Sequence, residues 1–171
     1  LINSLHHRKY RREHNLFVAE GIRICREAIE NDWEIRYLLF DNFHADIQKI
    51  ENLISDVLCL GADVIGVTSE ILSKISHKEN SQNVLCVICQ KWNDLPGIIK
   101  DKTFVALETV RDPGNLGTIL RTMDGVGATD CILLDDCTDP FSYESVRASM
   151  GAIFNVNIIA SSNKKFLKWK S

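Results

Sequence analysis

Proline, glycine and long apolar runs are scarce in this sequence of 171 residues. It contains 3 Pro and 9 Gly, which excludes collagen-like and low-complexity disordered chains. No run approaches the roughly 18 to 20 consecutive apolar residues of a membrane span, and the first residues lack the apolar centre of a signal peptide. The sequence therefore predicts a soluble, cytoplasmic protein with no membrane partner.

Cysteine is present, but not in a pattern typical of disulfides. The 6 cysteines lie within apolar stretches. Cys86 and Cys89 form a C-x-x-C motif, yet the sequence lacks the second pair or the neighbouring histidines of a zinc site. We therefore expect small buried thiols in a reducing compartment, and no metal.

Positive charge is concentrated in one short segment, although the formal net charge is −3. Residues 6–14 hold lysine and arginine side chains and three histidines around one tyrosine and one glutamate. Such a segment fits either a nucleic-acid contact or the solvated end of a helix. The candidate RNA-binding side chains are Arg8, Lys9, Arg11 and Arg12. A second basic stretch, 163–170, has the pattern of the polar face of a helix.

The first half of the chain alternates apolar runs with segments of helical periodicity. Strands are predicted at 16–19, 35–40, 64–67 and 84–88, and helices at 21–31, 45–53 and 69–76, with Ser69 as the N-cap of the last. This alternation predicts an α/β fold with a mainly parallel sheet covered by helices.

A second α/β series follows a stretch of turn-forming residues. Strands are predicted at 103–107, 131–134 and 153–159, and helices at 115–126 and 143–149. We therefore divide the chain into a first domain at 1–92, a linker at 93–101 and a second domain at 102–171.

The segment between the strand at 103–107 and the next helix is the best candidate for chemistry. It lies at the carboxyl end of a strand, where open α/β sheets place their ligands. Pro113 and Gly114 predict a turn, and Asn115 is suited to cap the helix that follows. The buried face of this helix is predicted to consist of Leu116, Ile119, Leu120, Met123 and Val126.

Arg121 falls on the opposite side of this helix. It is flanked by Gly117 and Gly125, so a ligand or another backbone has room to approach. The dinucleotide fingerprint, the phosphate loop and the hydrolase nucleophile elbow are all missing from the sequence. Downstream, Arg147, Ser149 and Gly151 precede an apolar run, as in a turn from helix to strand.

Together these motifs resemble the SpoU-type family of RNA ribose 2′-O-methyltransferases, a TrmH-like branch of the SPOUT superfamily. The resemblance rests on Asp-Pro-Gly-Asn-Leu-Gly-Thr-Ile-Leu-Arg at 112–121 and Arg-Ala-Ser-Met-Gly-Ala at 147–152. Arg-Lys-Tyr-Arg at 8–11 and Leu-Phe-Val-Ala-Glu-Gly at 16–21 are similar to the substrate-binding domain of the same family. The likeness extends over almost the whole chain.

The resemblance implies a small amino-terminal α/β/α RNA-binding domain, followed by a trefoil-knot methyltransferase domain that uses S-adenosyl-L-methionine. It implies a homodimer acting on tRNA or rRNA. By this likeness Arg121 and Asn115 are catalytic, and Gly117 and Gly151 are structural positions of the motifs. Arg147 and Ser149 join the basic segment as RNA contacts.

The resemblance also implies further motifs beyond residue 159, which complete the knot and the cofactor pocket. Because this chain starts without Met and stops at Ser171, we expect a truncated piece that binds S-adenosylmethionine weakly or not at all. We therefore assign no cofactor-binding residues. The alternatives are a non-catalytic RNA-binding module and a nucleotide-binding enzyme of another kind, which would need a phosphate loop.

Overall fold

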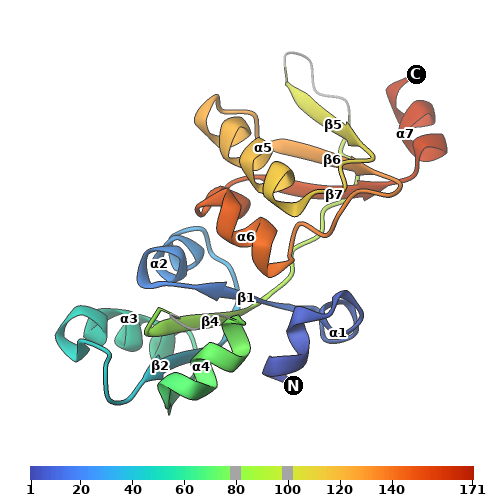
Figure 1. Ribbon diagram of the computed structural model, residues 1–171. Coiled ribbons are helices and arrows are strands. Elements are labelled where there is room, and N and C mark those ends of the chain that lie inside the picture. Colours follow the sequence, from blue (N-terminus) through green and yellow to red (C-terminus); the bar gives the residue numbers. More distant parts are fainter. Residues whose placement is uncertain (78–81, 98–101) are drawn as a thin grey trace. The chain divides into compact units, whose positions relative to one another are not determined.

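The computed structural model describes residues 1–77, 82–97 and 102–171 and divides the chain into two compact units (Figure 1). The first unit comprises Leu1–Gln90 and Phe141–Tyr143, and the second comprises Lys91–Pro140 and Glu144–Ser171. Part of the predicted linker, 98–101, lies outside the described residues. Asn93, at the start of that linker, instead forms a parallel bridge with Ile159 of the second unit.

The first unit is built on a mixed sheet with the strand order β1-β4-β2-β3. Strands β2 and β3 are parallel, whereas β4 runs antiparallel to both of its neighbours, β1 and β2. The prediction of a mainly parallel sheet in this half is therefore wrong for β4. The elements are η1 (Ile2–His6), α1 (Arg8–His14), β1 (Leu16–Glu20), α2 (Ile22–Glu30), β2 (Ile35–Asp41), α3 (Ile47–Cys59), β3 (Asp63–Val67), α4 (Ser69–Ser76) and β4 (Val84–Cys89).

Helices cover both faces of this sheet. On one face, Leu5 of η1 and Leu72 and Ile75 of α4 pack against strand side chains; the cluster also includes Leu16, Val18, Leu39, Leu85 and Val87. Side chains alternate along a strand, so Ala19 and Cys86 point to the other face. There Cys25 of α2 meets both, with its Sγ 3.9 Å from the Ala19 carbonyl oxygen. The predicted α/β/α arrangement is confirmed.

The second unit contains a parallel sheet, as predicted, and its strand order is β5-β6-β7. The predicted strand at 153–159 is only partly right, because its first residues form η2 and β7 starts later. An apolar run reports burial, which a short helix and a strand share. The elements are β5 (Phe104–Glu108), α5 (Pro113–Gly125), β6 (Asp130–Leu134), α6 (Tyr143–Ser149), η2 (Ala152–Phe154), β7 (Asn157–Ser161) and α7 (Asn163–Lys170).

Helix α7 covers one face of the second sheet, away from α5 and α6 (Figure 1). Phe166 and Trp169 of this helix pack on the buried strand side chains Ile132, Leu134 and Ile159. The indole nitrogen of Trp169 donates to the carbonyl of Pro96 at 2.6 Å. The stretch predicted to be the polar face of a helix is therefore a helix whose aromatic side chains close the core.

Four of the cysteines are buried as expected, namely Cys25, Cys86, Cys131 and Cys137. Cys59, at the end of α3, is exposed, so the prediction of a buried thiol is wrong there. Burial raises the pKa of Cys131 to about 12, which keeps this thiol protonated and unreactive. Cys86 and Cys89 lie three positions apart on β4 and therefore point to opposite faces, which prevents them from binding one metal ion.

Candidate active site and nucleic-acid interface

Helix α5 begins two residues earlier than predicted, at Pro113. Asp112 is the N-cap, and its Oδ1 accepts a hydrogen bond from the backbone N–H of Asn115 at 2.7 Å. Pro113 occupies the first helical position, where its missing N–H has no cost. The prediction that Asn115 caps the helix is therefore wrong, because Asn115 is the third residue of α5 and its side chain is exposed to solvent.

One face of α5 is buried through Leu116, Leu120 and Met123, as predicted. Val126 was expected on the same face, but it follows the last residue of the helix and is 75% exposed. Because α5 ends at Gly125, the predicted buried face is one residue too long.

Gly117 faces helix α6 rather than a ligand. A Cβ at this position would lie 2.6 Å from the carbonyl oxygen of Ser145 and 2.8 Å from the backbone nitrogen of Ser149. Ser145 also donates from Oγ to the carbonyl of Pro113 at 3.1 Å. The space predicted beside Gly117 is thus filled by the α6 backbone, whereas Gly125 has open space around it.

Arg121 projects from the exposed side of α5. It makes no hydrogen bond or ion pair with the residues that the structure describes, and it is exposed to solvent. Asn115 lies six residues earlier, about 9 Å along the helix axis, and helical side chains lean toward the N-terminus. The guanidinium therefore leans toward the end of α5 that carries Asn115. A permanently charged planar donor with no internal partner is suited to bind a phosphate.

Helix α6 contains both residues predicted as RNA contacts from the second motif, but it exposes only one of them. Arg147 lies exposed in its last turn, where a ligand can reach it. Ser149 is fully buried, and its hydroxyl donates to the carbonyl of Val146 at 2.7 Å. Ser149 is therefore not accessible to RNA. Gly151 has φ of 100° and is the N-cap of η2, which explains why glycine is favoured there.

The carboxyl ends of β5, β6 and β7 lie at one edge of the second sheet, because the strands are parallel. Two carboxylates at this edge, Glu108 and Asp135, have partners. Glu108 Oε1 accepts from Nδ2 of Asn163 at 2.6 Å, and Asp135 Oδ1 accepts from the backbone N–H of Asn163 at 3.1 Å.

The basic segment forms helix α1 in the first unit. Arg8, Lys9 and Arg12 are exposed, as a nucleic-acid contact requires. Arg11 is only 4% exposed, and its Nη1 donates to the carbonyls of Leu5 at 2.8 Å and His6 at 2.7 Å. The prediction that Arg11 is exposed for RNA contact is wrong, because its guanidinium is buried and connects α1 to the end of η1 by hydrogen bonds. The segment is largely helical, which agrees with the alternative that it is the solvated end of a helix.

Asp41, at the end of β2, is a buried charge that sequence reasoning missed. It is 1% exposed, and Oδ1 accepts from the backbone N–H groups of Phe43 at 2.9 Å and His44 at 3.0 Å. Ser69 donates from Oγ to Oδ2, and Nδ1 of His44 lies 3.2 Å from the same oxygen. Burial acts to raise the pKa of Asp41, but these hydrogen bonds outweigh it and lower the pKa to about 2.

The Asp41 cluster is structural. Ser69 donates a hydrogen bond from Oγ to the carboxylate, and this Oγ also lies 3.0 Å from Nδ1 of His44, the ring nitrogen that faces Asp41. In an activated serine nucleophile the serine and the carboxylate bind different imidazole nitrogens. Ser69 was predicted to be the N-cap of α4, but Thr68 is the N-cap and Ser69 is the first helical residue. The cluster thus ties the turn after β2 to the start of α4. No local sequence signal links residues that are 28 positions apart.

Ser69→Ala is expected to lower the free energy of unfolding by about 1 to 3 kcal/mol at neutral pH, because it removes a donor from a buried carboxylate. In the wild type, the depressed pKa of Asp41 contributes stability that is present above about pH 4 and lost as the pH falls toward about 2. We expect this loss to be shallower in the variant. Urea unfolding at a series of pH values measures both effects. Ser55→Ala, at an exposed site on α3, is the control and should change stability by less than about 0.5 kcal/mol.

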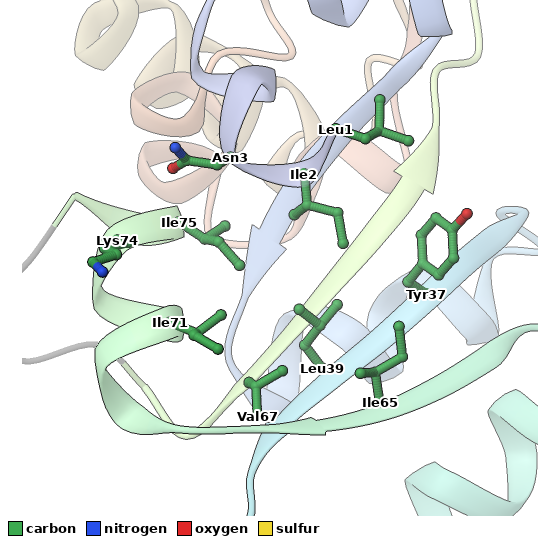
Figure 2. Close-up of a pocket in the computed structure, with 10 residues that line it drawn as sticks. All are labelled: Leu1, Ile2, Asn3, Tyr37, Leu39, Ile65, Val67, Ile71, Lys74 and Ile75. Carbon is green, nitrogen blue, oxygen red and sulfur yellow. The ribbon is translucent and has the colours of Figure 1, made fainter.

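An apolar pocket of about 530 Å³ lies in the first unit (Figure 2). Its walls come from η1, β2, β3 and α4, and they consist of Leu1, Ile2, Asn3, Tyr37, Leu39, Ile65, Val67, Ile71, Lys74 and Ile75. None of the site residues predicted from the sequence lines this pocket.

Comparison with protein families identifies the chain. A model described as the SpoU rRNA methylase family matches residues 102–170, and a model described as the MRM3-like substrate binding domain matches residues 1–86. The chain belongs to the SpoU family. The resemblance that rested on the motifs at 112–121 and 147–152 is confirmed, and so is the α/β architecture with a substrate-binding domain first.

The similarity of this SpoU-family chain to solved structures covers nearly all of its length. The AdoMet-bound rRNA methyltransferase from Sinorhizobium meliloti has a TM-score of 0.90 at 35% identity, covering 99% of this chain and 63% of that chain. The SpoU methyltransferase AviRb from Streptomyces viridochromogenes, in complex with AdoMet, has a TM-score of 0.88 at 25% identity, covering 98% of this chain and 64% of that chain.

Curated relatives of this SpoU-family chain have names that refer to ribosomal RNA. The 23S rRNA (guanosine(2553)-2′-O)-methyltransferase RlmP of Bacillus subtilis is 26% identical over 156 residues, which are 91% of this chain and 58% of that protein. The mitochondrial rRNA methyltransferase 3 of Xenopus tropicalis is 30% identical, over 90% of this chain and 37% of that protein. The chain thus spans less than two thirds of the length of these relatives.

Proposed function

We propose that the whole protein is an RNA ribose 2′-O-methyltransferase that acts on rRNA or tRNA. The observation that carries this proposal is Arg121, an exposed guanidinium with no partner among the described residues, on the helix of the first SpoU motif. Support comes from relatives that are named as 2′-O-methyltransferases of 23S rRNA. S-adenosyl-L-methionine is the proposed methyl donor, because related structures contain AdoMet.

In the proposed mechanism, Arg121 binds the phosphate next to the target ribose. A ribose hydroxyl is a poor nucleophile at neutral pH, so its proton must be removed as the oxygen attacks. Held by two parallel hydrogen bonds, the phosphate is positioned to accept that proton, and the positive charge stabilises the alkoxide that develops. S-adenosylmethionine, when bound, supplies an electrophilic methyl group. Asn115 adds a neutral donor and acceptor to orient the nucleotide.

RNA contacts are proposed for Arg8, Lys9 and Arg12 of α1 and for Arg147 of α6, all of which are exposed. These cations neutralise phosphates without reading the base sequence. Arg11 and Ser149 are omitted because both are buried and hydrogen-bonded to backbone carbonyls. The division into a substrate-binding domain at 1–92, a linker at 93–101 and a methyltransferase part at 102–171 belongs to the same proposal.

A homodimer and a trefoil knot are proposed from the family resemblance alone, and a cytoplasmic location is proposed from the sequence. Within the described ranges, no helix combines the length and apolar character needed to cross a membrane. In the same ranges, no group of three histidine, cysteine or acidic side chains is arranged to hold a metal.

The proposal predicts that the whole protein transfers label from methyl-labelled S-adenosylmethionine to rRNA or tRNA. The most sensitive substrate is RNA from cells that lack the gene, since its target position is unmodified. Incorporation should disappear after ribonuclease treatment and should be much lower on RNA from wild-type cells. RNA binding without any incorporation on either substrate would instead support the non-catalytic RNA-binding module.

A further inference from the structure

Five aromatic rings form a continuous row on the first unit, which we call the ring row: His77, His6, His7, Tyr10 and His14. Successive ring centroids are separated by 4.4 Å, 3.7 Å, 6.2 Å and 6.5 Å. The four histidines are exposed and Tyr10 is half-buried. The row therefore presents ring surface to solvent rather than closing the core.

The ring row is assembled from three separate segments that the fold holds in place. His6 ends η1, Tyr10 and His14 belong to α1, and His77 follows the last residue of α4. Buried Leu5 anchors η1 on the sheet, and the Arg11 guanidinium donates to the carbonyls of Leu5 and His6. Rings fixed in this way lose little conformational entropy when a partner stacks on them.

Tyr10 and His14 are the most regular pair in the row. Their planes are inclined by only 12°, and their centroids are 6.5 Å apart. Two nearly parallel rings present similarly oriented faces, and such faces are suited to contact the flat face of a nucleobase.

Cations lie among these rings. Arg8, Lys9 and Arg12 are exposed on α1, and Lys9 Nζ lies 5.6 Å from the centre of the Tyr10 ring. Positive side chains interleaved with aromatic rings are the combination that binds single-stranded nucleic acid, the cations on the phosphates and the rings on the bases. A duplex hides the faces of its bases and gains nothing from the rings.

We propose that the ring row is a stacking platform for unpaired RNA bases, with Arg8, Lys9 and Arg12 on the adjoining phosphates. This inference rests on the proposed function, since it takes RNA as the substrate, and it adds that the segment docked on α1 is single-stranded. The platform contributes to binding, and the chemistry remains at Arg121. Tyr10 and His14 bind base faces, and Arg11 is a positioning residue that holds η1 in register with α1.

The test measures binding of the full chain to two fluorescein-labelled RNAs of equal length, an unstructured strand and a hairpin duplex. The double variant Tyr10→Ala/His14→Ala is expected to bind the single strand at least about tenfold more weakly and the duplex unchanged. Tyr10→Phe, which keeps the ring, should bind both RNAs as the wild type does. Phe43→Ala removes a 76% exposed ring outside the row and should also leave both affinities unchanged.

The cations are expected to behave differently from the rings. Arg8→Glu/Lys9→Glu/Arg12→Glu should weaken binding of both RNAs and reduce the slope of log affinity against log salt by about 2, the value for three phosphate contacts on a single strand. Thermal unfolding of each variant confirms that it is folded.

Unchanged single-strand binding by the double ring variant, or equal losses on strand and duplex, would overturn the platform while leaving the proposed function intact. A polyglutamate peptide that binds as tightly as RNA would assign this surface to an acidic protein and overturn it as well. Failure of the wild type to bind either RNA, together with normal methyl transfer by the whole protein, would also contradict the platform alone. Failure of both assays would contradict the proposed function.

Discussion

Arg121→Ala is expected to reduce methyl transfer to RNA by about a thousandfold, the largest effect of any single substitution on this chain. Removing one preorganised donor from developing negative charge costs about 10²- to 10³-fold in rate, and this guanidinium is proposed both to bind the phosphate and to stabilise the alkoxide. Single-turnover transfer of labelled methyl groups, with saturating RNA, measures the loss in the chemical step.

The same assay separates the effect of the geometry of the Arg121 guanidinium from the effect of its charge. Arg121→Lys keeps the charge but loses the two-pronged donor, so we expect it to recover only a small part of the rate. Arg36→Ala removes an exposed arginine that pairs with Glu34 in the first unit and should leave transfer unchanged. Because Arg121 makes no hydrogen bond with the described residues, the Ala variant should unfold at the wild-type temperature. Full activity in Arg121→Ala would remove this residue from the mechanism.

Gly117→Ala is expected to destabilise the second unit by about 2 to 3 kcal/mol. The added methyl group would lie 2.5 Å from Cβ of Ala148 and within 3 Å of the α6 backbone, so the two helices must separate. Separation would also shift Arg147, which α6 carries, and methyl transfer should fall together with stability. Denaturant unfolding followed by circular dichroism measures the effect.

Gly125→Ala is the matched control, because it makes the same substitution on the same helix. Nothing lies within 4 Å of a Cβ at Gly125, and alanine is the better helix former. Stability should therefore rise by up to about 1 kcal/mol. If both variants were equally stable, close packing of α5 on α6 would not be the reason for glycine at 117.

Secondary structure was largely predictable from the sequence, whereas strand direction was not. Apolar runs marked β1 and β4 because these strands are almost wholly buried. Burial is independent of direction, so the insertion of β4 antiparallel between β1 and β2 left no trace in the pattern. The same limit explains η2, since its residues are as apolar as those of a strand.

The candidate site was predictable where it depends on local spacing. Helical periodicity placed Arg121 on the exposed side of α5, and the structure agrees. Periodicity did not indicate that Arg11 and Ser149 are buried. The partners of Arg11 are carbonyls at the end of η1, whose positions depend on how η1 packs against α1. The partner of Ser149 is local, the carbonyl of Val146, but its burial depends on the packing of α6, which local spacing does not show. Charged and hydroxyl side chains are usually exposed, and such contacts are the exception.

Features formed by residues far apart in the sequence could not be predicted from it. The Asp41 cluster needs Ser69, and the ring row needs His77, both of which come from α4 or its end. The spacing of His7, Tyr10 and His14 by three and four residues was the only part of the row visible in the sequence, since these positions share one helix face.

The most direct test of the central claim is the position of the transferred methyl group. After methyl transfer by the whole protein, the RNA is hydrolysed in alkali, which cleaves only next to a free 2′-hydroxyl. If Arg121 acts on a ribose hydroxyl, the label must remain in alkali-resistant dinucleotides. Label recovered in mononucleotides with a methylated base would contradict the account.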